Sequence, residues 1–355
     1  MTNKVAILGT GSWGTALAST FAENQNNDVI IWGISSDQID DININHQNKK
    51  YLGDSKLSPN LKATADMASA VVNANIILFV VPTKAIYDVA GKLNNVLIQL
   101  QNSQNHNQDQ QQKIIPIIGH ATKGIEANTF KRISQMINEA TFESLGALHI
   151  KEEDLFFLAG PSHAESVVAH AITLVSIASP NQQNAKFVQQ ALANKNFRVY
   201  TNTDIVGSEL AASLKNVLAI AGGIIKGLNM VDNTQAALVT RGLVEMKRFG
   251  VAMGGQNTTF DGLAGLGDLI VTAMSPNSRN FRAGLQLAQG KTLEEIQTEM
   301  GMVIEGIANT KAIYDLSQEK NINMPISTSV YNILYKGQKV EEAIDELMAR
   351  KLTSE

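Results

Sequence analysis

The sequence contains no cysteine among its 355 residues, which excludes disulfides, thiolate nucleophiles and cysteine-ligated zinc or iron–sulfur sites. Charged residues are also scarce, at 17% against about 25% in typical proteins, and asparagine and glutamine take their place. The 29 basic and 33 acidic residues leave a net charge of −4 without a basic cluster, which argues against a nucleic-acid partner. We expect a cytoplasmic protein and assign it no metal.

Uninterrupted apolar runs of membrane-spanning length are missing too. The N-terminus opens on a strand-like run rather than a basic segment leading into an apolar one, so no signal peptide is indicated. The most apolar helical stretch, 205–230, is interrupted by Glu209, Lys215 and Lys226, which a lipid-facing helix would tolerate poorly. We interpret this stretch as a buried helix of a soluble protein, without a membrane span.

The residues that are present fit two globular domains. The chain exceeds the roughly 250 to 300 residues at which single cores stop growing, and hydrophobic residues make up 44% of it. Short apolar runs alternate with segments of helical period up to about Thr203, and only helical patterns follow. We therefore predict one domain over residues 1–203 and a helical domain over residues 204–355.

The first domain is predicted to be a doubly wound sheet of the Rossmann type. A strand at 3–9, a helix at 12–24 and a strand at 29–32 form a β-α-β unit. Further strands are predicted at 76–81, 114–118, 155–159, 172–177 and 197–200. Because these runs are apolar at nearly every position, we expect a parallel sheet covered on both faces, followed by an all-α domain.

A glycine-rich turn follows the first predicted strand. Gly9, Gly11 and Gly14 form the pattern G-x-G-x-x-G at the start of the first helix. Gly9 permits a tight turn, Gly11 lets the backbone approach a pyrophosphate, and Gly14 lets helix and strand pack closely. The context predicts a dinucleotide site, although a glycine-rich turn without a ligand has the same spacing.

The residues after the second strand leave the choice of dinucleotide open. NAD sites place a carboxylate there and NADP sites place a cation, whereas this chain has Gly33, Ile34, Ser35 and Ser36, with Asp37 slightly late. We lean towards NADP because no well-placed acid would repel a 2′-phosphate. The two serines could equally be helix caps.

A lysine in the second domain is a candidate acid–base catalyst. Lys215 lies beside the apolar stripe of its helix, among the small residues Ala211, Ala212, Ala219 and Gly222. Burial among such residues would lower the lysine pKa towards neutrality, the range that suits proton transfer. On the pattern alone, a lysine that extends to solvent is the commoner case.

Other candidates lie at turns. Asp268 ends a glycine-rich turn, as an N-cap or a partner of a substrate hydroxyl, and the Ser278-Arg279-Asn280 trio could clamp a phosphate ester or form an ordinary surface turn. Lys123 and the Gly160-Pro-Ser162 turn follow predicted strands, where ligands of doubly wound sheets gather. The polar tract 99–112 is interpreted as a solvated loop or helix extension without an assigned function.

Taken together, these motifs resemble the bacterial NAD(P)-dependent sn-glycerol-3-phosphate dehydrogenase family. The matching segments, in family order over nearly the whole chain, are GTGSWGTALA from Gly9, ATKGIE from Ala121, GPSHAESV from Gly160, LAASLKNVLAIAGGI from Leu210, NTQAALVTRGLVEM from Asn233, GLAGLGDLIVT from Gly262, SRNFRAG from Ser278 and VIEGIANT from Val303. The chain departs from the family pattern at Ser162 and His163, where the family usually has threonine and an aromatic residue, and in the polar tract.

The resemblance implies reversible reduction of dihydroxyacetone phosphate to sn-glycerol 3-phosphate for phospholipid synthesis. It implies Lys215 as the proton donor and acceptor. The residues implied to hold the substrate are Lys123, Gly160, Ser162, Asp268, Ser278, Arg279 and Asn280. The residues implied to hold NAD or NADP include Gly9, Gly11 and Gly14. The others are Ser12, Trp13, Ile34, Lys123, Ala164, Arg279, Val303 and Glu305.

Two alternatives compete with this interpretation. One is a related hydroxyacid or sugar-acid dehydrogenase, whose substrate anion would be a carboxylate. The other is a dinucleotide-binding sensor that does no chemistry. A homodimer is plausible because a helical domain with exposed apolar faces often pairs.

Overall fold

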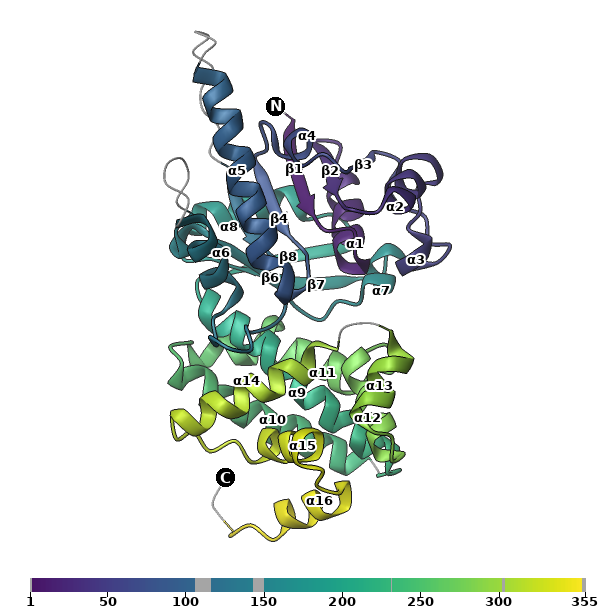
Figure 1. Ribbon diagram of the computed structural model, residues 1–355, viewed down its shortest axis with the longest axis vertical. Coiled ribbons are helices and arrows are strands. Elements are labelled where there is room, and N and C mark those ends of the chain that lie inside the picture. The colour runs from purple at the N-terminus through teal and green to yellow at the C-terminus, as the bar shows by residue number, and fades with distance from the viewer. Residues whose placement is uncertain (1, 106–115, 143–149, 231, 302–303, 353–355) are drawn as a thin grey trace. The chain divides into compact units, whose positions relative to one another are not determined.

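A computed structural model describes residues 2–105, 116–142, 150–230, 232–301 and 304–352 of the chain. These residues divide into two compact units (Figure 1). The first comprises residues up to Thr122 together with Ile133–Ile205, and the second comprises Lys123–Arg132 together with the chain from Val206 onwards. The segment Lys123–Arg132 therefore belongs to the second unit, although the chain on both sides of it belongs to the first.

The described part of the first unit contains a single eight-stranded sheet in the order β3-β2-β1-β4-β5-β6-β7-β8. The strands are β1 (Asn3–Leu8), β2 (Asn27–Trp32), β3 (Leu61–Thr64), β4 (Ile76–Phe79), β5 (Ile117–His120), β6 (Phe156–Ala159), β7 (Thr173–Ala178) and β8 (Phe197–Asn202). All neighbouring strands are parallel except β6 and β7, which pair antiparallel. The prediction of a parallel doubly wound sheet of the Rossmann type is confirmed, and the pair β6–β7 is its one departure among the described strands.

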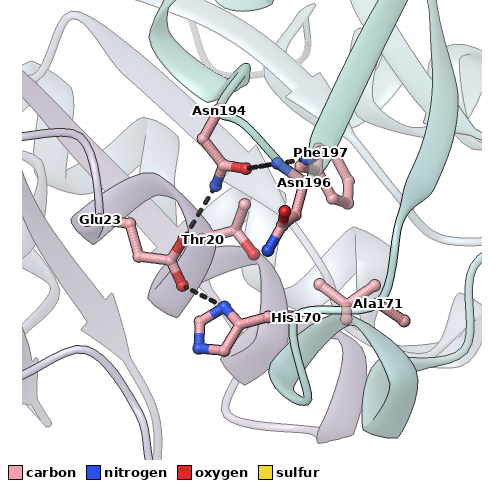
Figure 2. Close-up of a pocket in the computed structure, with 8 residues that line it drawn as sticks. Thr20, Glu23, His170, Ala171, Asn194, Asn196 and Phe197 are labelled. Carbon is pink, nitrogen blue, oxygen red and sulfur yellow. Dashed lines mark hydrogen bonds and ion pairs between the residues drawn. The ribbon is translucent and has the colours of Figure 1, made fainter.

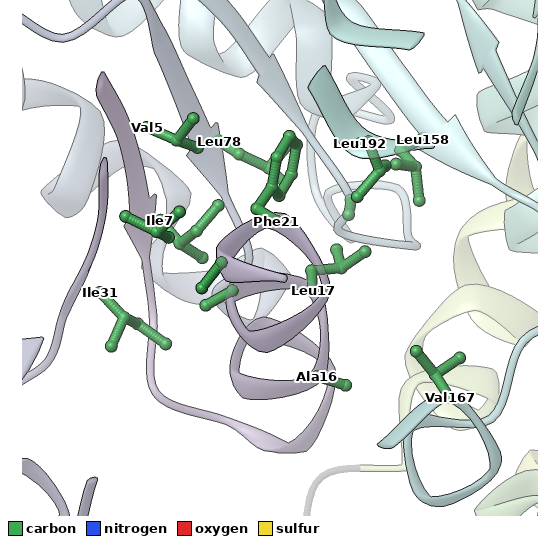
Figure 3. Close-up of a cluster of buried hydrophobic side chains, with 14 of the residues drawn as sticks. Val5, Ile7, Ala16, Leu17, Phe21, Ile31, Leu78, Leu158, Val167 and Leu192 are labelled. Atoms are coloured by element: carbon green, nitrogen blue, oxygen red, sulfur yellow. The ribbon is translucent and has the colours of Figure 1, made fainter. Parts of the chain in front are cut away.

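The helices of the first unit are α1 (Ser12–Ala22), α2 (Ser36–Asp40), α3 (Lys49–Leu52), α4 (Met67–Val71), α5 (Ile86–Asn105), α6 (Ile133–Phe142), α7 (Ala164–Val168) and α8 (Gln182–Leu192). Helices α1, α7 and α8 share one apolar core with the sheet (Figure 3). In that core, Leu17 and Phe21 of α1 pack against Val5 and Ile7 of β1, all fully buried. Burial of each such side chain contributes roughly 1.5 to 3 kcal/mol, which fixes α1 on the sheet.

The described residues of the second unit contain helices and no strand. The α-helices are α9 (Ile205–Gly227), α10 (Asp232–Ala252), α11 (Asp268–Ala273), α12 (Arg279–Ala288), α13 (Leu293–Met300), α14 (Glu305–Glu319), α15 (Pro325–Lys336) and α16 (Val340–Met348). Among described helices, only α9 is long and apolar enough to cross a membrane, yet 94% of its most apolar stretch is buried inside the protein. The prediction of a buried core helix is confirmed.

Glycines let two helices approach α9 at backbone distance. A Cβ at Gly222 would overlap the carbonyl oxygen of Ala273 in α11, and one at Gly223 would overlap that of Phe281 in α12. Helices that meet at glycine can pack closer than bulkier side chains permit. These contacts bring the end of α11 and the start of α12 close to the helix that carries Lys215.

Candidate functional site

The glycine-rich turn has the geometry that each glycine was expected to supply. Gly9 has a φ of +125°, and a Cβ there would overlap the carbonyl oxygen of Val80. A Cβ at Gly14 would overlap the carbonyl oxygen of Gly9, whereas one at Gly11 would meet nothing within 4 Å. Gly9 and Gly14 thus hold the turn against the sheet, and Gly11 leaves its outer side open.

This open side lies at the N-terminus of α1. Gly11 is the N-cap residue, and no side chain caps the first amides of the helix. Uncapped amides at the positive end of a helix dipole attract phosphate oxygens. The turn therefore fits the pyrophosphate of a dinucleotide, as the spacing predicts.

A buried polar network lies directly beneath the turn and was not predicted. Asn48 donates through Nδ2 to the carbonyl oxygen of Thr10 over 3.0 Å and to Oγ1 of Thr15 over 2.8 Å. The Gln38 amide exchanges hydrogen bonds with Thr10 and donates to Asn48. All four residues are buried. Because buried polar groups are costly unless paired, this network fixes the conformation of the turn.

The other dinucleotide candidates of the first unit lie at the ends of strands or the starts of helices. Ile34 follows β2 and is 86% exposed, while Ser12 and Trp13 begin α1 and Ala164 begins α7. Ser35 stands at the N-cap position of α2 without a capping hydrogen bond, and Ser36 instead donates to Asp37. The two serines thus start the next helix, as the alternative expects, but without a capping hydrogen bond, and the choice between NAD and NADP stays open.

Gly160 and Ser162 follow β6, as expected. Gly160 has a φ of +151°, and a Cβ there would come within 2.9 Å of Val175 Cα. The Ser162 hydroxyl donates to the carbonyl oxygen of Gly160 over 3.0 Å. This turn requires glycine, and its role towards substrate stays a prediction.

Lys215 forms the centre of a buried charged cluster in the second unit. Its ammonium donates to Oδ1 of Asp268 over 2.6 Å and to Oγ1 of Thr272 over 2.9 Å. The Lys123 ammonium donates to the other carboxylate oxygen of Asp268 over 2.9 Å. Lys215 is only 4% exposed. The alternative in which this lysine extends to solvent is therefore wrong.

Three separate segments supply this cluster. Lys215 lies in the middle of α9, Lys123 begins the segment Lys123–Arg132, and Asp268 is the first residue of α11, after the π-helical turn η5 (Leu263–Gly267). Asp268 is thus not an N-cap: the N-cap is Gly267, and the carboxylate binds the two ammonium groups instead. Its expected role beside a substrate hydroxyl stays a prediction.

Burial and charge set the protonation of the cluster. Burial lowers the pKa of Lys215 to about 7, although Asp268 opposes the shift, and the nearby charge of Lys123 lowers the pKa further. Burial acts on Lys123 in the same way, but Asp268 outweighs it and raises the pKa of Lys123 above its ordinary value. Burial would raise the pKa of Asp268, yet the two lysines hold it below its usual value. Asp268 is thus ionised, and Lys215 is the group that can exchange a proton near neutral pH.

A second acidic group interacts with this cluster. Glu305 begins α14. Burial raises the pKa of the Glu305 carboxyl, and the charges of Arg279, Lys123 and Lys215 oppose that shift. Glu305 thus interacts electrostatically with both lysines and with Arg279. Val303, the remaining cofactor candidate, lies outside the described residues.

The Ser278-Arg279-Asn280 turn is partly occupied by internal hydrogen bonds. The Ser278 hydroxyl caps α12 by accepting from the Phe281 amide over 3.3 Å. Asn280 donates to Asn216 Oδ1 and accepts from the Gly306 amide, each over 2.9 Å. Ser278 and Asn280 are buried, so the ordinary surface turn is wrong for these two residues. The trio is the start of a helix that is tied to α9 and α14.

Asn216 and Thr272 belong to the site although the sequence did not single them out. Thr272 accepts from Lys215 and donates to the Asp268 carbonyl oxygen over 2.6 Å. The Nδ2 atom of Asn216 is buried and has no hydrogen-bond partner among the residues that the structure describes. Asn216 adjoins Lys215, and Thr272 lies one helical turn after Asp268. That spacing is the signal that could have found both.

A separate hollow in the first unit is not part of this site. Figure 2 shows it lined by residues that include Glu23, His170 and Asn194. Its volume is about 10 Å³. Glu23 accepts from Asn194 over 2.9 Å and lies 3.4 Å from Nδ1 of His170. A space of that size holds about one water molecule. No predicted site residue lines it.

Within the described ranges, no group of three or more histidine, cysteine, aspartate or glutamate side chains is placed to hold a metal ion. A Rossmann-type sheet with a phosphate-binding turn and a separate buried lysine–carboxylate cluster define a nicotinamide-dependent dehydrogenase. Family models agree: residues 4–185 match the N-terminal model of NAD-dependent glycerol-3-phosphate dehydrogenase, and residues 204–345 match the C-terminal one. The chain belongs to the NAD-dependent glycerol-3-phosphate dehydrogenase family.

Individual relatives support the same family. The chain is 52% identical over 355 residues to glycerol-3-phosphate dehydrogenase (NAD(P)+) of Leuconostoc mesenteroides, covering 99% of each chain. It is 45% identical to the enzyme of the same name from Limosilactobacillus reuteri, covering 100% of this chain and 99% of the other. The crystal structure of glycerol-3-phosphate dehydrogenase from Coxiella burnetii matches with a TM-score of 0.83 at 36% identity, over 98% and 99% of the two chains.

Proposed function

We propose that this protein interconverts dihydroxyacetone phosphate and sn-glycerol 3-phosphate with NAD(P), and that Lys215 is its general acid and base. The observation that carries the proposal is the buried Lys215 ammonium, bonded to Asp268 over 2.6 Å and with a pKa lowered to about 7. The product is the backbone precursor of phospholipids. Family membership favours this activity over the hydroxyacid dehydrogenase and the sensor.

When bound, the reduced dinucleotide supplies a hydride to the ketone carbon of the substrate. Negative charge then grows on the ketone oxygen, and the Lys215 ammonium stabilises that charge and donates the proton that completes the alcohol. The neutral amine takes a new proton from solvent. In the reverse direction it removes the proton of the alcohol. Asp268 stays ionised throughout and holds the ammonium in place.

A pKa near 7 suits a group that must work in both directions. A lysine at its ordinary pKa would hold its proton too tightly to transfer it readily at neutral pH. Burial in the second unit lowers that pKa, and Asp268 keeps it from falling further. The cluster thus balances the two forms of the amine at neutral pH.

We assign the remaining substrate contacts to the other residues that the family resemblance implies. Arg279, as a planar guanidinium fork, suits the phosphate group. Lys123, which shares Asp268 with Lys215, supplies a second positive charge beside the reacting oxygen. Gly160, Ser162, Ser278 and Asn280 complete the proposed set. The spare amide hydrogen of Asn216 adds one candidate donor.

We assign the phosphate-binding turn for the dinucleotide to the first unit and catalysis to the second. The phosphates lie at Gly9, Gly11 and Gly14 in this proposal, with Ser12, Trp13, Ile34 and Ala164 around them. The further dinucleotide contacts in this proposal are Lys123, Arg279, Val303 and Glu305.

The domain bounds 1–203 and 204–355 stay predictions, as do the homodimer and the cytoplasmic location. Light scattering on a sizing column tests the dimer.

The direct test is a steady-state assay of purified protein. We expect dihydroxyacetone phosphate to support oxidation of NADPH or NADH, with the ratio of the two rates giving the preference. Turnover of a hydroxyacid but not of the phosphate would favour the first alternative. Cofactor binding without any turnover would favour the sensor.

A further inference from the structure

Lys123 depends on a short excursion of the chain for its place beside Asp268. The segment Lys123–Arg132 leaves the first unit after β5 and returns to it at α6. Lys123 itself lies two residues from Ile125, which forms an isolated antiparallel bridge with Arg132. The two ends of the excursion are therefore held side by side, and what anchors Arg132 also anchors the end that carries Lys123.

The interior of the excursion is a tight turn that transmits this constraint. Glu126 accepts from the amides of Asn128 and Thr129 over 2.8 and 2.6 Å. Its own amide donates to the Lys131 carbonyl oxygen over 2.9 Å. Phe130 has a φ of +58° and packs against the apolar core of the second unit. Together with the bridge between Ile125 and Arg132, these hydrogen bonds hold the segment together as one compact piece.

Two anchors fix this piece on α9. Arg132 forms an ion pair with Glu209 over 2.6 Å, with side-chain exposures of 11% and 1%. Asn309 of α14 accepts from the Ile125 amide over 3.4 Å and donates to the Ser213 carbonyl oxygen over 3.3 Å. Glu209 and Ser213 lie on the same helix as Lys215. The helix that carries one ammonium thus also holds the segment that carries the other.

We propose that Arg132, through its ion pair with Glu209, is a positioning residue that keeps the Lys123 ammonium on Asp268. This inference rests on the proposed function, because it concerns the same site. Arg132 contacts no reacting atom in the proposal: it acts only through Lys123. A buried ion pair rarely stabilises the folded state more than an apolar contact of similar size. Its directional geometry, however, suits it to holding the segment in one position.

A double-mutant cycle on kcat/KM for dihydroxyacetone phosphate tests the proposal. In the full-length wild-type background, Arg132→Met should lower kcat/KM by about tenfold or more, and Arg132→Lys should recover most of that loss. In the Lys123→Met background, Arg132→Met should cost less than about twofold more, because residues that act as one unit are not additive. Equal losses in both backgrounds would overturn the proposal.

A pH profile supplies a readout that a purely structural role would not move. Lys215 faces Asp268, Thr272 and Lys123, and it interacts with Glu305. Retreat of Lys123 removes a positive charge from beside Lys215, so the pH dependence of reduction should move to higher pH in Arg132→Met. Unchanged pH dependence together with an unchanged kcat/KM would contradict the inference.

Controls separate this inference from folding and from the function itself. Lys311→Met breaks an exposed ion pair with Asp315 in the same unit and should leave kcat/KM unchanged. Circular dichroism and a melting curve show whether each variant folds, and Glu209→Gln provides a second way to weaken the pair. If neither Arg132→Met nor Glu209→Gln folds, the pair serves stability and the proposal fails. Absence of wild-type turnover would instead refute the proposed function.

Discussion

The ammonium nitrogen of Lys215 lies 2.6 Å from Oδ1 of Asp268, and both side chains are almost fully buried. The second oxygen of the same carboxylate binds Lys123 over 2.9 Å. One anion is thus shared by two cations, so the cluster carries an excess positive charge in a buried place. Such an excess lowers the affinity of Lys215 for its proton, and it also attracts the negative charge that develops on a substrate oxygen.

Replacement of Lys215 is the first prediction. Lys215→Ala removes the proton donor, so kcat should fall by roughly 10²-fold or more, with the KM for NADPH nearly intact. Single-turnover and steady-state rates measure this change. Lys226→Ala alters an exposed lysine in the last turn of the same helix and serves as the control. A Lys215→Ala enzyme that works at the wild-type rate would refute the assignment.

The pH dependence of the two directions is the second prediction. Reduction needs the protonated amine, so its kcat should be high below the Lys215 pKa of about 7 and fall as pH rises through it. Oxidation needs the neutral amine, so its kcat should rise through the same pH. Rates measured from pH 5 to 9 in both directions give these two pH profiles. If the two rates changed with pH in the same direction, one group could not be both the acid of reduction and the base of oxidation.

Asp268 provides a check on the cause of that pH dependence. Its carboxylate favours the ammonium form of Lys215. Asp268→Asn should therefore shift the pH dependence of both reduction and oxidation to lower pH, in addition to lowering kcat. Asp261→Asn removes a half-exposed carboxylate that pairs with Lys247 and is the matched control. If the pH dependence of both rates is unchanged in Asp268→Asn, a group other than Lys215 is responsible for it.

Truncation of Arg279 is the third prediction. Arg279→Ala should chiefly raise the KM for dihydroxyacetone phosphate because a guanidinium fork on the phosphate is lost. A smaller effect on dinucleotide binding is expected too. Arg282 is exposed three residues further along α12, and Arg282→Ala should leave both constants unchanged. If the KM of Arg279→Ala equals that of the wild type, Arg279 is not the phosphate clamp.

The fourth prediction concerns the close packing of α9 and α12. A Cβ at Gly223 would overlap the Phe281 carbonyl oxygen, and such overpacking typically costs about 1–3 kcal/mol. Gly223→Ala should therefore lower the melting temperature by several degrees. A Cβ at Gly91 in α5 would meet nothing within 4 Å, so Gly91→Ala should leave the protein unchanged or gain about 0.5–1 kcal/mol. Equal melting temperatures of the two variants would contradict the packing argument.

The sequence predicted most of the elements that surround the site because their signals are local. The spacing of Gly9, Gly11 and Gly14 located the first turn, and apolar periodicity located α9. Strand β3 was missed: it has four residues at the sheet edge and alternates buried with exposed positions. The antiparallel pairing of β6 with β7 was missed as well, because the direction of a strand leaves no local trace.

The contacts within the site were harder to predict because they join distant segments. Asp268 lies 53 residues after Lys215 and 145 residues after Lys123, and nothing local in the sequence links them. The glycine pattern around Asp268 suggested a turn, yet the carboxylate faces the two lysines rather than the helix amides. The close approach of α9 and α11 at Gly222 and Ala273 is likewise a contact between segments far apart in the chain.

The excursion Lys123–Arg132 means that no single cut divides this chain into its two halves. The polypeptide passes from one unit to the other at residues 122–123, 132–133 and 205–206. A fragment that starts at Val206 would lack Lys123, and Asp268 would then neutralise Lys215 alone. An engineer who wishes to swap the dinucleotide-binding half for another must therefore transfer this short segment together with the helices of the second unit.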